Sequence, residues 1–338
     1  MDLERLKGIF YLICAFSFAG TSVIAGRLLN GQMGPFTITG VSLLLGILCL
    51  LPVAWRGILS AIRLMTLRDW TLLGLQALFG VFLFRMFLLF GLQHTSAGEA
   101  GIITGATPAV TVMLARVVLK ESIHRTKLAG ILSTVGGILL IQELLSPGAK
   151  LSIMHLAGNV LVLCAAISES IFNILSRAAA VTTERTQREH LHPMAQTAIV
   201  SVIALLLCLV PAILEDPISS LSTIGVEAWL TLVWYGPVVT SLAFICWYAG
   251  IKRCLASTAA ALSGMMPFTS MLLSVLVLGE HAGWPQWAGG MMVIIGMILI
   301  GGSDNQEHKP SEQNGASSKR SNRLTAHASD SNGKVFEE

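Results

Sequence analysis

The sequence predicts an all-α integral membrane protein of ten transmembrane helices, built as two inverted five-helix repeats and followed by a disordered C-terminal tail. Three observations predict this fold class: the composition, a row of apolar segments and an internal repeat. Of the 338 residues, 54% are hydrophobic and 12% are charged, and the mean hydropathy is +0.72. Soluble domains carry about 25% charged residues, so the composition excludes an ordinary water-soluble globule.

Ten apolar segments are separated by short polar breaks, and a membrane-spanning helix needs about 20 apolar residues. We place the segments at Gly8–Gly26, Gly34–Trp55, Trp70–Leu92, Gly98–Leu119, Leu128–Ile141, Leu156–Ser176, Met194–Leu214, Trp229–Ile251, Ala256–Leu278 and Trp287–Gly302. The fifth segment is short for a full crossing at about 1.5 Å per residue. After Gly302 the chain becomes rich in Ser, Asn, Glu and Lys, which predicts a disordered tail over residues 303–338.

Basic residues predict the orientation in the membrane. With the N-terminus inside, the loops expected in the cytoplasm hold most of the loop arginines and lysines, whereas the outer loops hold only Arg27 and Lys150. Basic loops resist translocation and stay on the cytoplasmic side. We therefore expect a multi-pass protein of the cell membrane with both termini in the cytoplasm.

Motifs of enzymes, metal sites and nucleic-acid binders are missing from the sequence. The six cysteines show no metal-ligand spacing, and H-E-x-x-H, G-x-S-x-G and Walker motifs do not occur. No clustered basic surface that would bind nucleic acid is found. We expect no enzyme activity, no cofactor, no metal and no nucleic-acid partner.

The most informative feature is an internal repeat. A shift of 159 positions aligns residues 69–141 with residues 228–300 without a gap, and it keeps Trp, Pro, Glu and Gly in register. The matched pairs include Trp70 and Trp229, Gly91 and Gly250, Gly105 and Gly264, Pro108 and Pro267, Glu121 and Glu280, Gly130 and Gly289, and Gly137 and Gly296. A fainter relation at 150 positions pairs Arg27 with Arg177.

An odd number of spans in each copy gives the two copies opposite orientations in the membrane. We place the copies at residues 6–145 and 151–302. Inverted repeats around a shared site are typical of secondary transporters, because the same fold can then open to either side in turn. The repeat therefore predicts a carrier that works by alternating access.

The repeated residues also resemble a known family. The run GLQHTSAGEAGIITGATPAVTVMLARVVLKES followed by LAGILSTVGGILLI, and its second copy GIKRCLASTAAALSGMMPFTSMLLSVLVLGEH followed by WAGGMMVIIGMILI, resemble the EamA repeat of the drug/metabolite transporter superfamily. The resemblance implies ten helices, cytoplasmic termini, a central cavity and export of amino acids or other small metabolites. A nucleotide-sugar or lipid-intermediate transporter is the alternative within the superfamily, and an intramembrane sensor or enzyme is the alternative from another class.

Two charged residues inside apolar segments are candidates for the binding site. Arg85 lies near the middle of the third span, where a charge costs roughly 3 kcal/mol on insertion scales; it would either bind a substrate carboxylate or phosphate or hold helices together through an ion pair. Glu169, Asn173 and Arg177 form one polar stripe on the sixth span. Glu169 would either exchange a proton or pair with Arg85, and we favour the pair or a pair switched by substrate.

Further candidate site residues lie on one face of the eighth span, and two prolines are candidate hinges. Trp234, Ser241 and Tyr248 follow at helical spacing, and aromatic residues with polar atoms suit an organic ligand. Pro108 and Pro267, within the fourth and ninth spans, would act as hinges or as fixed kinks. The expected partners are a small-molecule substrate and membrane lipid, while proton coupling and a homodimer are left open.

Overall fold

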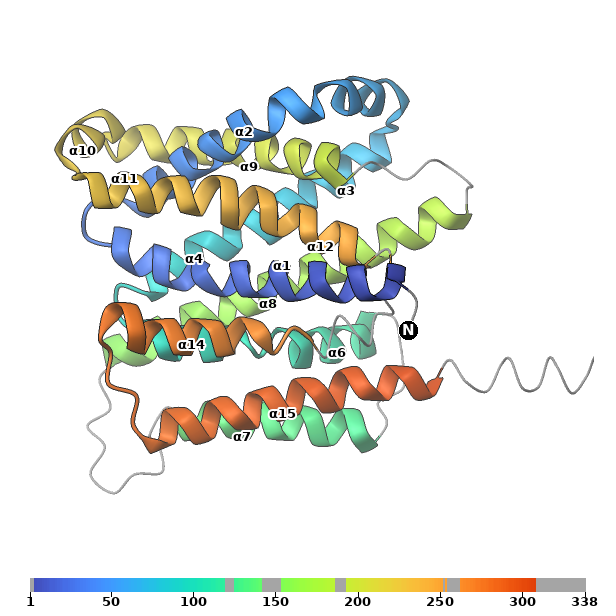
Figure 1. Ribbon diagram of the computed structural model, residues 1–338, viewed down its shortest axis with the longest axis vertical. Helices are drawn as coiled ribbons and strands as arrows, with labels where there is room; N and C mark the ends of the chain where they lie inside the picture. The colour runs from blue at the N-terminus through green and yellow to red at the C-terminus, as the bar shows by residue number, and fades with distance from the viewer. Residues whose placement is uncertain are drawn as a thin grey trace, which may run out of the picture.

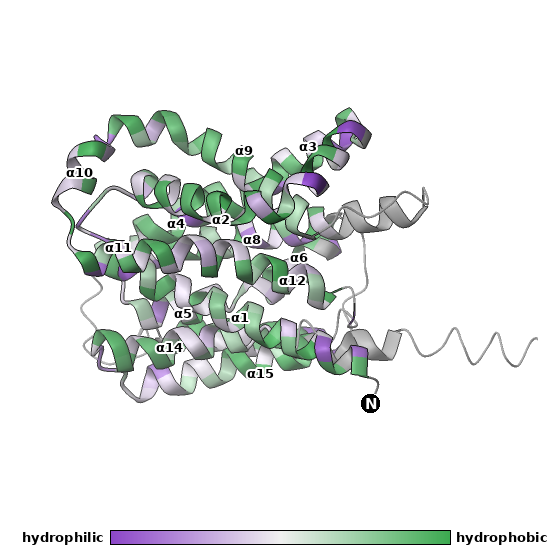
Figure 2. Ribbon diagram, turned by 45° about the horizontal axis from the view of Figure 1, so that its top comes forward, coloured by the Kyte–Doolittle hydropathy of each residue, from purple (hydrophilic) through white to green (hydrophobic). Residues whose placement is uncertain are grey.

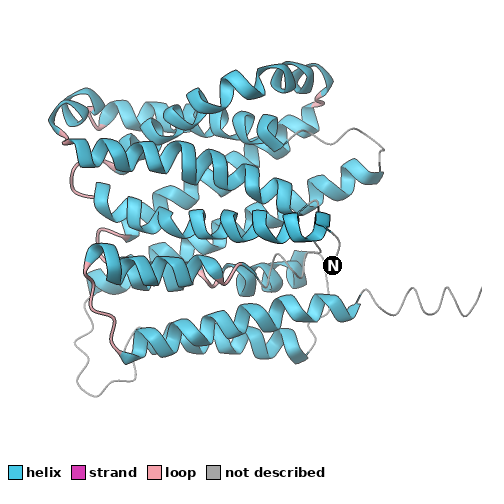
Figure 3. Ribbon diagram, viewed as in Figure 1, coloured by secondary structure: helices cyan, strands magenta, loops and turns pink. Residues whose placement is uncertain are grey.

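The structure, a computed structural model, describes residues 3–118, 125–141, 153–185, 193–251, 253 and 262–307. Within these ranges the chain forms helices joined by short loops, without any β-strand (Figure 3). The all-α prediction is thereby confirmed for the described part of the chain.

The helices of the first half begin near the N-terminus and end at Ile141. They are α1 (Leu3–Leu29), α2 (Pro35–Leu64), α3 (Leu67–Ala77), η1 (Leu78–Leu83), α4 (Phe84–Gly91), α5 (Ala97–Thr104), α6 (Thr107–Val118) and α7 (Arg125–Ile141). The segment η1 is a π-helical stretch that joins α3 and α4 into one continuous helix.

The helices of the second half begin at Ile153 and end at Glu307. Its helices are α8 (Ile153–Arg185), α9 (Pro193–Leu214), α10 (Pro217–Thr223), α11 (Val226–Val233), η2 (Trp234–Leu242), α12 (Ala243–Ile251), α14 (Met265–Leu278) and α15 (Trp284–Glu307). The π-helical segment η2 again joins two α-helices, α11 and α12, into one continuous helix.

Seven helices of the described chain are long and apolar enough to cross a membrane. They lie at Leu6–Leu29, Pro35–Ser60, Leu67–Gly91, Ala97–Leu114, Ile153–Ser176, Met194–Leu214 and Val226–Ile251. Two shorter apolar helices cover Met265–Leu278 and Trp284–Ile300. The structure thus supports a helical membrane protein, and the count of ten spans stays a prediction.

The bundle has two packed helix pairs at opposite ends. In Figure 1, α2 and α9 lie together at the top, and α7 and α15 lie together at the bottom. Between these pairs α1 packs on α12 and α14, while α8 packs on α4, α5 and α6. Polar side chains such as Ser42, Gln76 and Arg85 are buried inside the bundle.

Apolar residues cover much of the outside as well. Val117 is 76% exposed and Leu206 is 62% exposed, and hydrophobic residues run along most helices in Figure 2. An apolar exterior of this extent would be costly in water, whereas it matches the lipid around a membrane-spanning bundle.

The fourth span is broken, which changes the predicted position of Pro108. Helix α5 ends at Thr104, and α6 begins at Thr107 after a turn at Gly105 and Ala106. Pro108 is therefore the second residue of α6 and Pro267 the third residue of α14. The expectation that both prolines lie in helix interiors is wrong: they lie in first turns, where the N–H that proline lacks has no helical partner anyway. Their role as hinges stays a prediction.

The last helix is longer than the sequence suggested. Helix α15 continues to Glu307, so residues 303–307 of the predicted tail are helical, and residues 308–338 lie outside the described ranges. Glu121 and Lys150, which the sequence argument used, lie outside them too.

Close helix contacts recur at matching positions in the two halves. A β-carbon built on Gly91 of α4 would lie 2.7 Å from Val162 Cγ2 of α8, and one built on Gly250 of α12 would lie 2.7 Å from Leu12 Cγ of α1. Gly250 follows Gly91 by 159 positions, and Val162 follows Leu12 by 150. The shifts of 159 and 150 positions found in the sequence therefore also relate pairs of residues that are in contact.

Helices α7 and α15 contact each other through glycines that the shift of 159 positions relates. Gly130 contacts Gly296 and Gly137 contacts Gly289, with a built β-carbon 2.7 Å and 2.5 Å from the facing carbonyl oxygen respectively. Because the residue numbers rise on one helix as they fall on the other, the helices run antiparallel. Glycine is needed here, since a side chain on either helix would separate the two backbones.

Candidate functional site

Arg85 is buried between the helices of both halves. Its side chain is 5% exposed, and its Nη1 donates a hydrogen bond to Ser42 Oγ of α2 at 2.7 Å. Its Nη2 donates to Thr240 Oγ1 of η2, and its guanidinium carbon lies 4.3 Å from the centre of the Tyr235 ring. Hydroxyls and an aromatic face thus surround a positive charge inside the bundle.

Glu169 lies at the break in the fourth span. Its Oε2 lies 2.8 Å from Thr107 Oγ1, at the start of α6. The same hydroxyl lies 2.8 Å from Thr104 O, so its single proton can serve only one acceptor at a time. The N-terminus of a helix favours a negative charge, and the start of α6 therefore suits the Glu169 carboxylate. Asn173 lies one turn further along α8 and is partly buried.

The ion pair between Arg85 and Glu169 that we favoured is not formed in the described part of the protein. Arg85 bonds to Ser42 and Thr240, and Glu169 bonds to Thr107. The two charged groups are thus held by separate sets of hydroxyls. A pair switched by substrate, or a free proton site at Glu169, stays open.

The three predicted residues of the eighth span have different surroundings. Ser241 is buried and donates to Gly46 O of α2 at 3.0 Å, which makes it a packing contact between helices. Tyr248 is 4% exposed, and its hydroxyl has no hydrogen-bond partner among the described residues. Trp234 is 44% exposed, and its Nε1 donates to Thr21 Oγ1 at 2.9 Å. Trp234 therefore does not share a site with Arg85.

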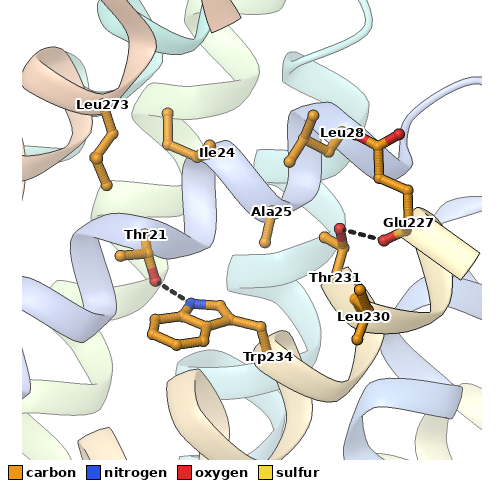
Figure 4. Close-up of a pocket in the computed structure, with 9 residues that line it drawn as sticks. All are labelled: Thr21, Ile24, Ala25, Leu28, Glu227, Leu230, Thr231, Trp234 and Leu273. Carbon is orange, nitrogen blue, oxygen red and sulfur yellow. Dashed lines mark hydrogen bonds between the residues drawn. The ribbon is translucent and has the colours of Figure 1, made fainter. Parts of the chain in front are cut away.

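Trp234 lines a cavity of about 330 Å³ between α1, α11 and α14 (Figure 4). Its walls are formed by Thr21, Ile24, Ala25, Leu28, Glu227, Leu230, Thr231, Trp234 and Leu273. Of the predicted site residues, Trp234 alone belongs to this lining. The cavity is thus a place separate from Arg85 and Glu169.

Sequence reasoning missed Ser42, Tyr235 and Thr240. The expected face of the eighth span was drawn at 3.6 residues per turn, whereas η2 is π-helical and has a wider turn. The wider turn places Tyr235 and Thr240, five residues apart, beside the same guanidinium. Pro237 inside the span is the signal that could have warned of an irregular turn.

Glu215 and Glu280 form hydrogen bonds between the two halves near one end of the bundle. Glu215, after α9, accepts hydrogen bonds from the Phe36 and Thr37 amides at the start of α2. Glu280, after α14, accepts from the Ala97 and Gly98 amides at the start of α5, both at 2.9 Å. The first amides of a helix lack helical partners, so each carboxylate caps a helix of the other half.

Glu4 forms a different contact near the N-terminus, outside the membrane-spanning segment. It accepts hydrogen bonds from Lys7 Nζ at 2.8 Å and from Arg253 Nε at 3.1 Å. These bonds, first that from Lys7, lower the pKa of the Glu4 carboxyl below its ordinary value. All three side chains are exposed, and contacts of this kind add little stability.

Comparison with known proteins identifies the family. The EamA-like transporter family matches residues 6–142 and again residues 156–302. The chain belongs to this family. The family model matches this chain twice, and the family together with the apolar helices makes it a membrane transport protein.

Relatives of this EamA-like protein are also named as transporters. The Bacillus subtilis "Uncharacterized transporter YetK" is 29% identical over 297 residues, which cover 88% of this chain and 87% of the relative. A Salmonella typhimurium protein named "Probable amino-acid metabolite efflux pump" is 30% identical over 230 residues, covering 67% and 74%. A solved crystal structure with 18% identity covers 88% of this chain and 95% of its own, with a TM-score of 0.60, and shares the fold.

Proposed function

We propose that this protein is a secondary transporter of the cell membrane that exports a small polar organic metabolite, such as an amino acid or a related compound. In this proposal ten helices form two five-helix repeats of opposite orientation, with both chain termini in the cytoplasm. The substrate site is open to one side of the membrane at a time.

The main support for the proposal is that close helix contacts recur at matching positions of the two halves. Matching positions of the two halves make matching contacts at Gly91 and Gly250, and the crossed glycine pairs of α7 and α15 are the contacts that a two-fold relation between the halves would produce. Two similar halves can exchange their conformations, which closes one end of the bundle while it opens the other. A fold of this kind supports a carrier more than an enzyme or a sensor.

The substrate site is proposed to lie beside the broken fourth span. Discontinuous helices provide free backbone groups inside a membrane and are used as binding sites by transporters. Glu169 lies at this break, and Asn173 follows it on α8. Together with Arg85 and Tyr248 they give the interior a polar character that suits a polar metabolite. The relative named as an amino-acid metabolite efflux pump supports that substrate class.

Transport is tested with purified protein in liposomes that are loaded with a mixture of amino acids and related metabolites. Compounds lost from protein-containing liposomes, but retained by protein-free ones, are identified by mass spectrometry. We expect loss of one compound or of one chemically related group. If every compound is retained equally in the two preparations, the proposed function is wrong.

Alternating access is tested with a reversible crosslink. A β-carbon built on Gly98 of α5 lies 3.8 Å from Ser274 Cβ of α14, which is within the range for a disulfide. In a variant without other cysteines, Gly98→Cys with Ser274→Cys should stop transport after oxidation and recover it after reduction. The two single variants are the controls. Equal transport by the oxidised and reduced double variant would contradict alternating access at this end.

A further inference from the structure

Arg85 has N–H groups that donate no hydrogen bond within the part of the chain that the structure describes. A guanidinium has five N–H groups, and two of those on Arg85 are donated, to Ser42 and Thr240. The remaining groups have no hydrogen-bond partner within the described ranges, and no carboxylate there forms an ion pair with Arg85. A buried charge with neutral neighbours alone is unfavourable, so a negatively charged group from outside the chain would complete it.

Tyr235 offers a further unused donor beside this charge. Its side chain is 1% exposed, its ring lies under the Arg85 guanidinium, and its hydroxyl has no hydrogen-bond partner among the described residues. Buried hydroxyls are nearly always hydrogen-bonded. The unpartnered Tyr235 hydroxyl and the free guanidinium N–H groups are therefore all donors without an acceptor in this part of the described interior.

Ser42 and Thr240 hold the guanidinium in a defined direction. Ser42 Oγ donates its proton to Thr39 O at 3.0 Å, and Thr240 Oγ1 donates its proton to Tyr235 O at 2.9 Å. Because each hydroxyl has a single proton, both can only accept from Arg85. The Tyr235 carbonyl is five residues before Thr240, so the π-helical turn of η2 fixes this orientation.

We propose that Arg85 and Tyr235 bind a carboxylate of the transported molecule, with Ser42 and Thr240 as positioning residues. This inference rests on the proposed function. The planar fork of arginine matches a carboxylate with two parallel hydrogen bonds, and the Tyr235 hydroxyl supplies another donor. One guanidinium charge balances one carboxylate, whereas a phosphate dianion would leave a negative charge without a partner in the interior.

The test uses pairs of ligands in which an uncharged amide replaces the carboxylate, together with methyl phosphate. Purified full-length protein is melted with L-leucine or L-leucinamide, L-phenylalanine or L-phenylalaninamide, benzoate or benzamide, and methyl phosphate. A ligand that binds the folded protein raises its melting temperature. We expect the carboxylate member of at least one pair to stabilise the wild type and its amide to have no effect.

Three variants separate binding from folding. Arg85→Gln should abolish the preference for the carboxylate. Tyr235→Phe keeps the ring under Arg85 and should bind about tenfold more weakly, as expected for loss of one hydrogen bond to a charged group. Thr240→Val is measured by transport in liposomes, where it should raise the KM for the carboxylate without lowering kcat. Thr240→Ser keeps the accepting oxygen and should restore the KM.

Several results would overturn the inference. One is that no carboxylate stabilises the wild type more than its amide does; another is that Arg85→Gln keeps the preference. Stabilisation by methyl phosphate alone would replace the carboxylate with a phosphate. If liposomes show export of uncharged compounds at equal rates for the wild type and Arg85→Gln, the carboxylate site is wrong while the proposed transport function stands.

Discussion

Individual polar residues inside this bundle are held by hydroxyl groups of neighbouring helices. Ser42 and Thr240 accept from Arg85, and Thr107 donates to Glu169. Hydroxyls lower the cost of burying a charge but do not cancel it, because they carry no net charge. We therefore expect that Arg85 can respond to a ligand and Glu169 to a ligand or a proton, which a tight ion pair between them would prevent.

Glu169 is the residue at which we expect proton coupling. In Glu169→Gln the side chain keeps its size and still accepts from Thr107, but it can no longer take up or release a proton. We expect the variant to transport at a rate that does not respond to an imposed pH gradient, whereas the wild type responds. The measurement is substrate efflux from liposomes with and without the gradient.

A control variant separates Glu169 from carboxylates in general. Asp216 is exposed in the loop before α10 and has a positive φ of 51°, a conformation that asparagine also adopts readily. Asp216→Asn should therefore keep the response of the wild type. A wild type that ignores the gradient, or a Glu169→Gln variant that responds as the wild type does, contradicts proton coupling at this residue.

At the scale of single elements, irregular helices determine the candidate site. The π-helical segment η2 brings Tyr235 and Thr240 to Arg85, and the break between α5 and α6 brings Thr107 to Glu169. Regular helices would have satisfied their own backbone and would have placed these side chains on different faces.

This irregularity also explains which residues the sequence could predict. Arg85 and Glu169 were found because a charge stands out in an apolar segment, whatever the exact helix geometry. Tyr235 and Thr240 were missed because periodicity assumes 3.6 residues per turn. Pro108 was placed in a helix interior because its segment reads as one apolar run, although Gly105 allows the chain to turn there.

The contact between α2 and η2 gives a prediction for one element pair. A β-carbon on Gly236 would collide with the backbone oxygen of Ser42, and it would lie 3.1 Å from the Gly46 nitrogen. Gly236→Ala therefore forces the two helices apart, which should cost roughly 1–3 kcal/mol and should loosen Ser42 from Arg85. The melting temperature of the purified protein should fall.

Gly74 provides the matched control for that substitution. It lies in α3, and a β-carbon built on it would meet nothing within 4 Å. Gly74→Ala should leave the protein as stable as the wild type or stabilise it by up to about 1 kcal/mol, because alanine favours the helix. Equal melting temperatures for the wild type and Gly236→Ala would contradict the close contact.

For the whole molecule, the repeat predicts two halves of equivalent helices, and this layout stays a prediction. The 159-residue shift predicts that equivalent residues have similar neighbours, and the close contacts of Gly91 and Gly250 agree with it. The crossed contacts of Gly130 with Gly296 and of Gly137 with Gly289 are a consequence that periodicity alone does not give. They depend on how α7 and α15 pack against each other, which is a property of the packed bundle.

Orientation in the membrane gives the last prediction. With both termini in the cytoplasm, the loop after α1, with Gln32, and the loop before α15, with Gly283, should face outside, while Arg63 at the end of α2 should face the cytoplasm. Single cysteines are placed at each position in a cysteine-free variant and treated with a maleimide that does not cross membranes. We expect Gln32→Cys and Gly283→Cys to react in intact cells, and Arg63→Cys to react only after the cells are permeabilised. If only the seven long helices crossed the membrane, six of them would separate Gln32 from Gly283, and both would again face outside. Ser219 of α10 distinguishes the two counts, because it faces outside with ten crossings and the cytoplasm with seven. We expect Ser219→Cys to react in intact cells. Labelling of Arg63→Cys in intact cells, or a Ser219→Cys that reacts only after permeabilisation, would contradict the inverted ten-helix arrangement.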